Sequence, residues 1–209
     1  MVLHTFGDSH AWFPKSWEAV IIKDLTLKLH KLFSEIDGTV GYTMSRFGYQ
    51  KKYLLNIKDY GVKENDAILF GFGEIDCRMH ICKPKNFEKY KSLINDLVYN
   101  YFEAIKENIE QYSNLKVLVY NILPPLRNYG ANTGAPSDPE KRKAVVLYMN
   151  EKLKEYCNKN NYIFVDVYNS YCDKDKFLLQ YDNSLLGNDI HISNGIYVKE
   201  FLLKNLMNN

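Results

Sequence analysis

Apolar residues along this chain fall into short continuous runs, separated by longer stretches in which they recur at helical spacing. Four apolar, β-branched or aromatic runs predict strands at residues 2–6, 67–72, 116–122 and 162–167, and residues 39–43 form a weaker fifth candidate. The runs are nearly continuous rather than alternating, which is typical of strands buried on both faces of a parallel sheet.

Helical spacing predicts helices at residues 17–32, although the β-branched start of this stretch is ambiguous, at 50–57 and at 87–109. The third carries an apolar stripe made by Tyr90, Leu93, Ile94, Leu97, Tyr101 and Ile105. The segment Ser137-Asp138-Pro139-Glu140 has the form of a capping box and predicts a helix that ends near residue 158. Ser193 is expected to cap a last helix over residues 194–206.

Strands that alternate with helices predict a three-layer α/β/α fold with a central, mostly parallel sheet of about five strands, a flavodoxin-like arrangement. Right-handed crossovers then place helices on both faces of the sheet. At 209 residues, without an internal repeat or a linker, the chain is expected to form one domain, residues 1–209. Residues 121–136 are rich in Pro, Gly and Asn; they either border the active-site face or form a surface insertion.

Composition narrows the class of protein. Apolar residues make up 46% and charged residues 25% of the chain, with a formal charge of +2 and the basic residues scattered among acids, so no nucleic-acid partner is expected. No apolar run approaches the roughly 20 residues that span a bilayer. No secretory signal precedes the first strand, so we expect a cytoplasmic protein with reduced thiols. The spacing of Cys77 and Cys82 matches no strong zinc pattern, and neither a metal nor another cofactor is expected.

Reactive groups follow the first predicted strand directly, in the segment Phe6-Gly7-Asp8-Ser9-His10. A serine is a poor nucleophile unless a base lies within hydrogen-bond reach and a further group orients that base. Among the five histidines, His4 lies inside the first strand and His30 on a predicted helix face, so both are expected to be structural. His10 adjoins Ser9 and is poorly placed to face it. His80 follows a strand and remains possible, whereas His191 precedes the last helix with Asp189 two residues earlier.

The order of these segments resembles the SGNH (GDSL-like) hydrolase superfamily. Gly7-Asp8-Ser9 is similar to its first block, and Gly48 matches the loop glycine of the second, with Gly41 as the rival. Gly73-Glu74-Ile75-Asp76 falls where the third block follows a strand, and His191 matches the base in the last block. The resemblance runs from residue 2 to residue 195.

The resemblance implies that Ser9 attacks an acyl carbonyl while His191 takes the serine proton. The backbone N–H groups of Ser9 and Gly48 would donate to the oxyanion, where loss of one donor costs roughly 10²–10³ in turnover. The family's third block usually supplies an asparagine, and Ile75 stands in its place. Glu74, Asp76 and Arg78 are the polar candidates near it. Arg78 is always a donor; it either faces the site or forms a structural ion pair with Glu74 or Asp76.

The acid that steadies His191 also departs from the family pattern. Three residues before the histidine stands Asn188, and the acid lies at Asp189. Either Asp189 takes over after a local shift of the loop, or a backbone carbonyl orients His191 and the site works as a dyad.

The resemblance implies a serine esterase or O-acyltransferase acting on a small-molecule or glycan ester, and the 17 tyrosines favour a carbohydrate. Two other classes stay open. Asp8 and His10 also fit the opening of a metal-dependent phosphoesterase, whose chemistry needs further ligands. A catalytically inactive glycan-binding module on the same fold is the second, because fold does not guarantee activity. The oligomeric state cannot be deduced from these patterns.

Overall fold

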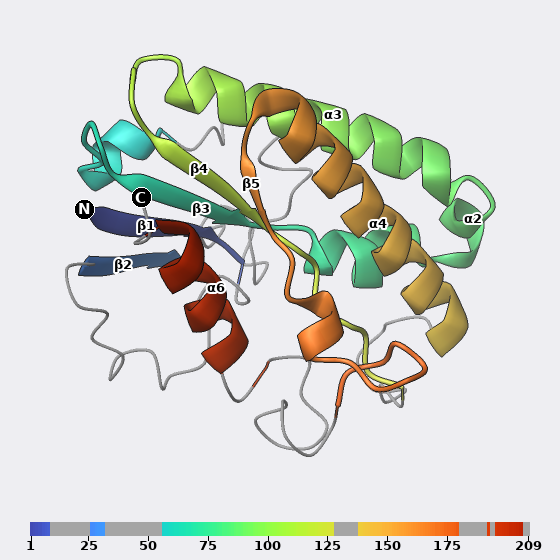
Figure 1. Cartoon of the computed structure of the whole chain (residues 1–209). Helices are drawn as coiled ribbons and strands as arrows, with labels where there is room; N and C mark the ends of the chain where they lie inside the picture. The colour runs from blue at the N-terminus through green and yellow to red at the C-terminus, as the bar shows by residue number, and fades with distance from the viewer. Residues whose placement is uncertain (9–25, 32–55, 128–137, 180–191, 193–194, 207–209) are drawn as a thin grey trace.

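A five-stranded parallel sheet forms the centre of the molecule (Figure 1). The computed structural model of the chain describes residues 1–8, 26–31, 56–127, 138–179, 192 and 195–206. The strands are β1 (Val2–Gly7), β2 (Thr26–Lys31), β3 (Ala67–Gly71), β4 (Lys116–Tyr120) and β5 (Ile163–Val165), in the order β2-β1-β3-β4-β5. This is the flavodoxin-like order, and it confirms the predicted class of fold.

Side chains of the central strands alternate between two apolar clusters, one on each face of the sheet. On β3, Ile68 and Phe70 belong to one cluster, whereas Ala67 and Leu69 belong to the other. All four side chains are inaccessible to solvent. The sheet is therefore buried on both faces, which explains why its strands read as continuous apolar runs in the sequence.

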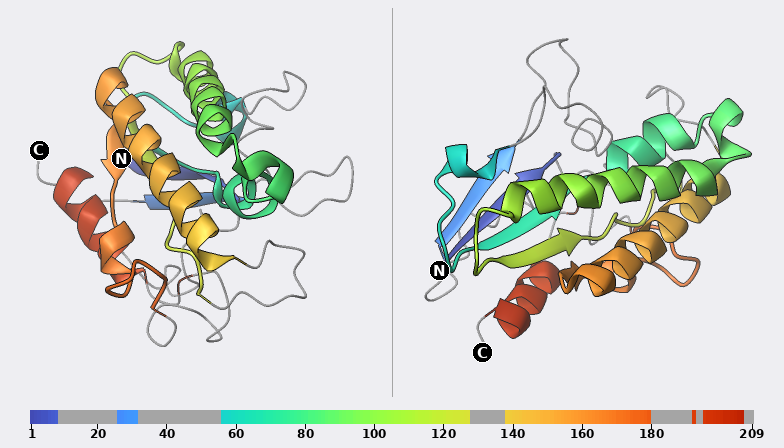
Figure 2. Two further views of the ribbon diagram at one scale, coloured as in Figure 1. Left: turned by 90° about the vertical axis from the view of Figure 1, so that its right-hand side faces the viewer. Right: turned by 90° about the horizontal axis from the view of Figure 1, so that it is seen from above.

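Helices cover both faces, as Figures 1 and 2 show. The helices α3 (Tyr90–Ile109) and α4 (Pro139–Asn160) pack against each other, and both contribute to the cluster that contains Phe70. The helix α6 (Ile196–Leu206) contributes to the opposite cluster, which contains Leu69. This confirms three layers. Within the described part of the chain, no helix is long and apolar enough to cross a membrane.

The long helices form near the predicted positions, with a correction at two starts: α3 begins at Tyr90 rather than at residue 87, which ends the separate helix α2 (Pro84–Phe87), and the cap of α4 lies one residue later than predicted. Its N-cap is Asp138 rather than Ser137, because one carboxylate oxygen of Asp138 accepts from the N–H groups of Glu140 at 3.0 Å and Lys141 at 3.2 Å. Pro139 then occupies the first helical position, where its missing N–H costs nothing. Ser137 and Ser193 lie outside the described residues.

The prediction of a helix over residues 17–32 is wrong at its carboxyl end. Residues 26–31 form the edge strand β2, which pairs in parallel with β1. Leucines alternate with polar residues in Thr26-Leu27-Lys28-Leu29, a period of two that fits a strand, and the sheet edge supplies the hydrogen-bonding partner. His30 consequently belongs to a strand. The candidate strand at 39–43 lies outside the described residues, as does most of the helix predicted at 50–57, whose described end, Ile57, starts the short 3₁₀ helix η4 (Ile57–Tyr60).

The strands β4 and β5 are shorter than predicted because the chain leaves the ladder early. After β4, the Asn121 N–H still donates to the carbonyl of Val165 at 3.3 Å, but the Ile122 N–H turns to the Asn150 side chain of α4. Beyond β5, the Val167 N–H donates to Asn121 Oδ1 at 2.9 Å. Both strands thus end in polar side-chain contacts near the carboxyl edge of the sheet.

Candidate active site

The carboxyl ends of β1 and β3 meet where the strand order reverses. The connection that follows β1 leads to β2 on one side, whereas the connection that follows β3 leads to β4 on the other. Open parallel sheets bind ligands in the crevice outside such a switch point. The Asp8 N–H donates to the carbonyl of Gly71 at 3.2 Å, so the segment that leaves β1 stays beside the end of β3.

A small pocket occupies this edge of the sheet. It encloses about 200 Å³, part of it open to solvent, and the residues that line it follow three neighbouring strands: Asp8, Gly71, Phe72, Glu74, Tyr120, Asn121, Ile122 and Leu123. Asp8 is 1% exposed. We call this pocket the edge pocket. The predicted nucleophile, Ser9, follows Asp8 directly in the sequence, so the edge pocket is the described pocket next to the predicted nucleophile.

The turn that follows β3 positions the polar residues of the third predicted block. Gly73 has φ of 116°, a backbone conformation that side-chain-bearing residues rarely adopt. The Cys77 N–H then donates to the carbonyl of Gly73 at 3.0 Å. The chain continues as η5 (Asp76–Ile81), a short π-helix, a form that is frequent at functional sites. Glu74 therefore comes to line the edge pocket.

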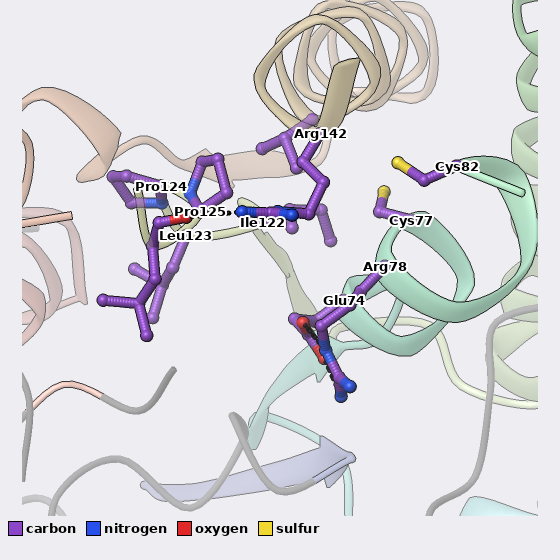
Figure 3. A pocket seen from close by; sticks show the side chains of 11 residues that line it. Glu74, Cys77, Arg78, Cys82, Ile122, Leu123, Pro124, Pro125 and Arg142 are labelled. Carbon is purple, nitrogen blue, oxygen red and sulfur yellow. Dashed lines mark hydrogen bonds and ion pairs between the residues drawn. The ribbon is translucent and has the colours of Figure 1, made fainter. Parts of the chain in front are cut away.

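Arg78 forms a bidentate ion pair with Glu74. Its Nε donates to one carboxylate oxygen at 2.6 Å and a terminal nitrogen donates to the other at 3.0 Å (Figure 3). The two side chains are 18% and 12% exposed. Of the two roles that the sequence left open for Arg78, the described contacts show the ion pair, and this fork is the stronger type of charge-assisted bond.

The buried thiol of Cys77 lies within electrostatic reach of three carboxylates, those of Asp76, Glu74 and Asp8. Burial raises the pKa of this thiol well above its usual range, and the charges of Cys82, Asp76, Glu74 and Asp8 add to the shift. Burial likewise raises the pKa of the Tyr101 phenol, with smaller contributions from Cys157, Asp8 and Asp76. Asp8, Glu74 and Asp76 are thus close enough to act on common neighbours. Of these three acids, Glu74 is the one that the described contacts pair with Arg78.

A second pocket adjoins the first and is larger, enclosing about 420 Å³ of space that is partly open to solvent. It lies between η5, α4 and the chain that follows β4 (Figure 3). We call it the side pocket. It is lined by Glu74, Cys77, Arg78, Cys82, Ile122, Leu123, Pro124, Pro125, Leu126, Arg142 and Val146. Glu74, Ile122 and Leu123 line both pockets, so the two are contiguous.

Residues 122–126, which follow β4 and which we call the wall, are held by side chains of α4. The Asn150 amide brackets Ile122: its Oδ1 accepts from the Ile122 N–H at 2.7 Å, and its Nδ2 donates to the Ile122 carbonyl at 2.8 Å. Leu126 lies four residues after Ile122, and its carbonyl accepts from Arg142 at 2.9 Å. Arg142 is 3% exposed. No sequence pattern indicates a role for either residue, because asparagine and arginine on a helix usually face solvent.

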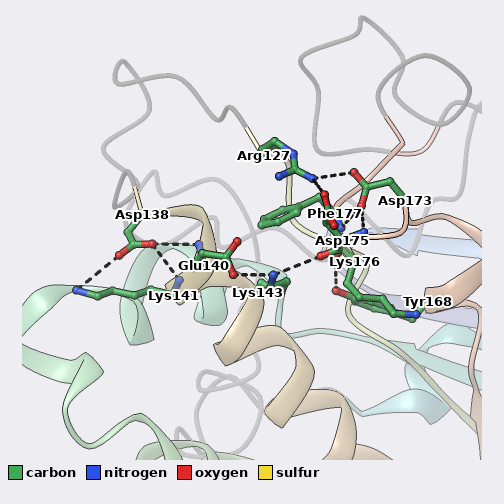
Figure 4. A network of polar contacts seen from close by, with 10 residues as sticks. All are labelled: Arg127, Asp138, Glu140, Lys141, Lys143, Tyr168, Asp173, Asp175, Lys176 and Phe177. Carbon is green, nitrogen blue, oxygen red and sulfur yellow. Dashed lines mark hydrogen bonds and ion pairs between the residues drawn. The ribbon is translucent and has the colours of Figure 1, made fainter.

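A second set of contacts fastens the end of this wall to the turn that follows β5 (Figure 4). Arg127 bridges Asp173 at 3.1 Å and Asp175 at 2.9 Å, and its guanidinium lies 4.4 Å from the ring centre of Phe177. Lys143 of α4 covers the same ring at 4.7 Å. Residues 121–126 therefore line the two pockets, which favours the first of the two interpretations of residues 121–136, whereas residues 128–136 lie outside the described part.

Several predicted site residues fall outside the described residues: Ser9, His10, Gly41, Gly48, Asn188, Asp189 and His191. The residue after His191 is described; Ile192 is 4% exposed and belongs to the apolar cluster that includes Leu123 and Leu126. His80 is exposed on η5, and His4 is buried in β1 with Nε2 at 3.5 Å from Asp66. Among the described residues, no three His, Cys, Asp or Glu side chains form a group that could hold a metal ion.

The parallel sheet and the site at its switch point define the class: the chain has the fold of the GDSL-like (SGNH) lipolytic hydrolases, as the sequence resemblance implied. It is similar to a member of the lipolytic G-D-S-L family from Veillonella parvula, with a TM-score of 0.60, 15% identity and full coverage of both chains. A Streptococcus pneumonia protein provisionally described as a platelet activating factor superposes with a TM-score of 0.66 at 18% identity, over 97% of this chain and 82% of that chain.

A GDSL-like lipase from Bacteroides thetaiotaomicron gives a TM-score of 0.58 at 14% identity, over 97% of this chain and 85% of that chain. At these identities the likeness concerns the fold. No protein-family model matches the sequence. No curated protein matches it either.

Proposed function

We propose that this protein is a serine ester hydrolase in which Ser9 is the nucleophile and His191 the general base. The observation that carries the proposal is the position of Asp8: buried, bonded to the end of β3 and lining the edge pocket, one residue before Ser9. A serine that follows a strand at this point of the sheet emerges where the fold collects ligands. The fold likeness to lipolytic hydrolases supports the same reaction class.

The reaction proceeds through an acyl-enzyme. Ser9 Oγ forms a bond to the acyl carbon while His191 takes its proton, and the alcohol leaves with that proton as the carbon–oxygen bond of the ester breaks. Water then attacks with His191 again as the base and releases the carboxylic acid. The Ser9 and Gly48 N–H groups stabilise the oxyanion, and Asp189, Asn188 or a backbone carbonyl orients the imidazole.

The Glu74–Arg78 pair borders the space in which the substrate lies. Because Glu74 lines both pockets and Arg78 lines the side pocket, the pair contacts bound substrate while its own charges are matched. Asp76 is 2% exposed and is the first residue of η5, two residues after Glu74. These are the substrate-binding roles that we assign to the three polar residues of the third block.

Ser9→Ala tests the proposal. On a panel of p-nitrophenyl esters and acetylated sugars, we expect this variant to lose roughly 10⁴-fold or more in turnover, as triad residues do. A fluorophosphonate probe should label the wild type and not the variant. Asp189→Asn is the companion: a loss near 10⁴ identifies a triad, whereas a loss under tenfold identifies a dyad. Hydrolysis that survives Ser9→Ala and disappears with a chelator would instead support the metal-dependent alternative using Asp8 and His10.

The same panel decides the acceptor and the carbohydrate prediction. Deacetylation of sugars would support a carbohydrate esterase. Transfer of the acetyl group to a sugar hydroxyl in place of water would support a carbohydrate O-acetyltransferase. Absence of both turnover and labelling would favour a glycan-binding module without catalysis.

A further inference from the structure

The side pocket is contiguous with the edge pocket, and part of its lining is buried. Cys77, Cys82 and Val146, which belong to this lining, are 1%, 2% and 4% exposed. Since the two pockets share Glu74, Ile122 and Leu123, a molecule that reacts at the edge pocket can extend into the side pocket. That an ester carbonyl reacts with Ser9 at the edge pocket rests on the proposed function.

The lining of the side pocket is chemically aliphatic. Most of its side chains come from two prolines and four aliphatic residues, Ile122, Leu123, Leu126 and Val146. The residues that line it include no aromatic ring. Burial raises the pKa of Cys82 to about 12 against a smaller lowering by Arg142, so the thiol is neutral at physiological pH. Buried neutral thiols pack as small apolar groups.

The charged residues of the pocket are directed at protein partners. Arg78 is paired with Glu74 at the rim. Arg142 donates to the carbonyls of Leu126 at 2.9 Å and Arg127 at 3.4 Å, and its guanidinium reaches toward the wall that follows β4 (Figure 3). An arginine placed in this way offers its methylene stem to the pocket while its head group holds the wall.

The wall is fixed before any ligand arrives. Ile122 is bracketed by Asn150, the Leu178 N–H donates to the carbonyl of Pro125 at 3.0 Å, and Arg142 holds Leu126. A preformed apolar pocket of this kind binds without the entropic cost of ordering its walls.

We propose that the side pocket holds the acyl group of the substrate and that the acyl group is a short aliphatic chain. The acyl group stays bound to Ser9 after the alcohol has left, so a preformed apolar pocket contiguous with the edge pocket suits the acyl side, whereas the alcohol must depart toward solvent. The pocket is small and borders the buried side chains of Cys77, Cys82 and Val146, which limits the chain length.

Substitution of Val146 tests the proposal by hydrolysis. Val146→Phe fills the pocket and Val146→Ala enlarges it, while Leu147→Phe, one residue on and 41% exposed, is the matched control. With p-nitrophenyl esters, each methylene that fits should raise kcat/KM by about fourfold. We expect the ratio of hexanoate to acetate ester kcat/KM to fall at least tenfold in Val146→Phe and the preferred chain to lengthen in Val146→Ala, with Leu147→Phe unchanged.

A parallel series of acetate esters with ethyl, butyl and hexyl alcohols separates the two sides of the ester. A Val146 effect that appears in the alcohol series and not in the acyl series would overturn the acyl assignment. Unchanged chain-length profiles in both Val146 variants would overturn the pocket itself, while loss of activity in Ser9→Ala would still uphold the proposed function.

Calorimetric binding of hexanoate tests the pocket without any turnover. The wild type and Ser9→Ala should bind hexanoate more tightly than acetate, with a negative heat-capacity change from apolar burial, and Val146→Phe should lose this preference. If the esters are not hydrolysed but this preference exists and vanishes in Val146→Phe, the pocket proposal stands and the proposed function fails. Equal binding of hexanoate and acetate by the wild type would refute the pocket proposal.

Discussion

Glu74 and Arg78 show how burial decides what one ion pair contributes. Their closest contact, 2.6 Å, equals that between Lys106 and Glu103 on α3. The Glu74 and Arg78 side chains are 12% and 18% exposed, whereas those of Glu103 and Lys106 are 44% and 48% exposed. Solvent screens an exposed pair strongly, and the single contact of Lys106 lacks the two-pronged geometry of Arg78.

A double-mutant cycle on each pair measures this difference. For Glu74→Gln with Arg78→Met, we expect a coupling energy of about 1–2 kcal/mol in the free energy of unfolding, from denaturant titration. For Glu103→Gln with Lys106→Met, we expect less than about 0.5 kcal/mol. Equal couplings in the two cycles would show that the bidentate geometry at the pocket rim adds nothing.

At the residue scale, the sequence points to candidate reactive groups more readily than to the residues that hold the pocket walls in place. Asp8, Glu74, Asp76 and Arg78 stand in short segments after strands, and parallel strands bring such segments to one edge. Asn150 and Arg142 act through contacts with carbonyls and an N–H more than 15 residues away, which no local pattern encodes.

The element that shapes the site most directly is α4, because it replaces the sheet as the hydrogen-bonding partner of the chain after β4. Asn150 satisfies both the N–H and the carbonyl of Ile122, which is 4% exposed. A buried backbone N–H left without a partner costs about 1–3 kcal/mol.

Asn150→Ala is therefore expected to lower the free energy of unfolding by about 1–3 kcal/mol, measured by urea denaturation. Asn150→Asp keeps the acceptor for the Ile122 N–H but not the donor for the Ile122 carbonyl. Its free energy of unfolding should lie between those of the wild type and Asn150→Ala. Asn100→Ala is the control, since the Asn100 amide donates only within α3, to Asp96, in an exposed bond. If Asn150→Ala lowered the free energy of unfolding no more than Asn100→Ala does, the two Asn150–Ile122 hydrogen bonds would not stabilise the protein.

Elements with long or continuous patterns are the ones that the sequence predicts well. The stripe along α3 fixes that helix because 20 residues repeat one spacing. The edge strand β2 escapes prediction because only six residues distinguish a period of two from a helical period, and pairing with β1 decides the outcome. The start of α4 shifts by one residue because Asp138, immediately before Pro139, accepts from the N–H groups of Glu140 and Lys141.

At the scale of the whole molecule, the two apolar clusters share a single sheet. Ile68 and Leu69 are consecutive residues of β3, both inaccessible to solvent, and they point into opposite clusters. Loss of either side chain weakens the same strand. The layers on the two faces should therefore unfold together, as the sequence-based expectation of one domain requires.

Ile68→Ala and Leu69→Ala test this coupling from opposite faces. Each should lower the free energy of unfolding by about 2–5 kcal/mol, because each leaves a cavity in a packed cluster. Native-state hydrogen exchange should show equal losses of protection in α3, on the face of Ile68, and in α6, on the face of Leu69. Leu147→Ala, at a 41% exposed position, should change stability by less than about 0.5 kcal/mol. If Leu69→Ala weakened α6 alone while α3 kept its protection, the two faces would be separate cooperative units, and the edge pocket, which receives residues from β1, β3 and β4, would be held by a sheet that opens one face at a time.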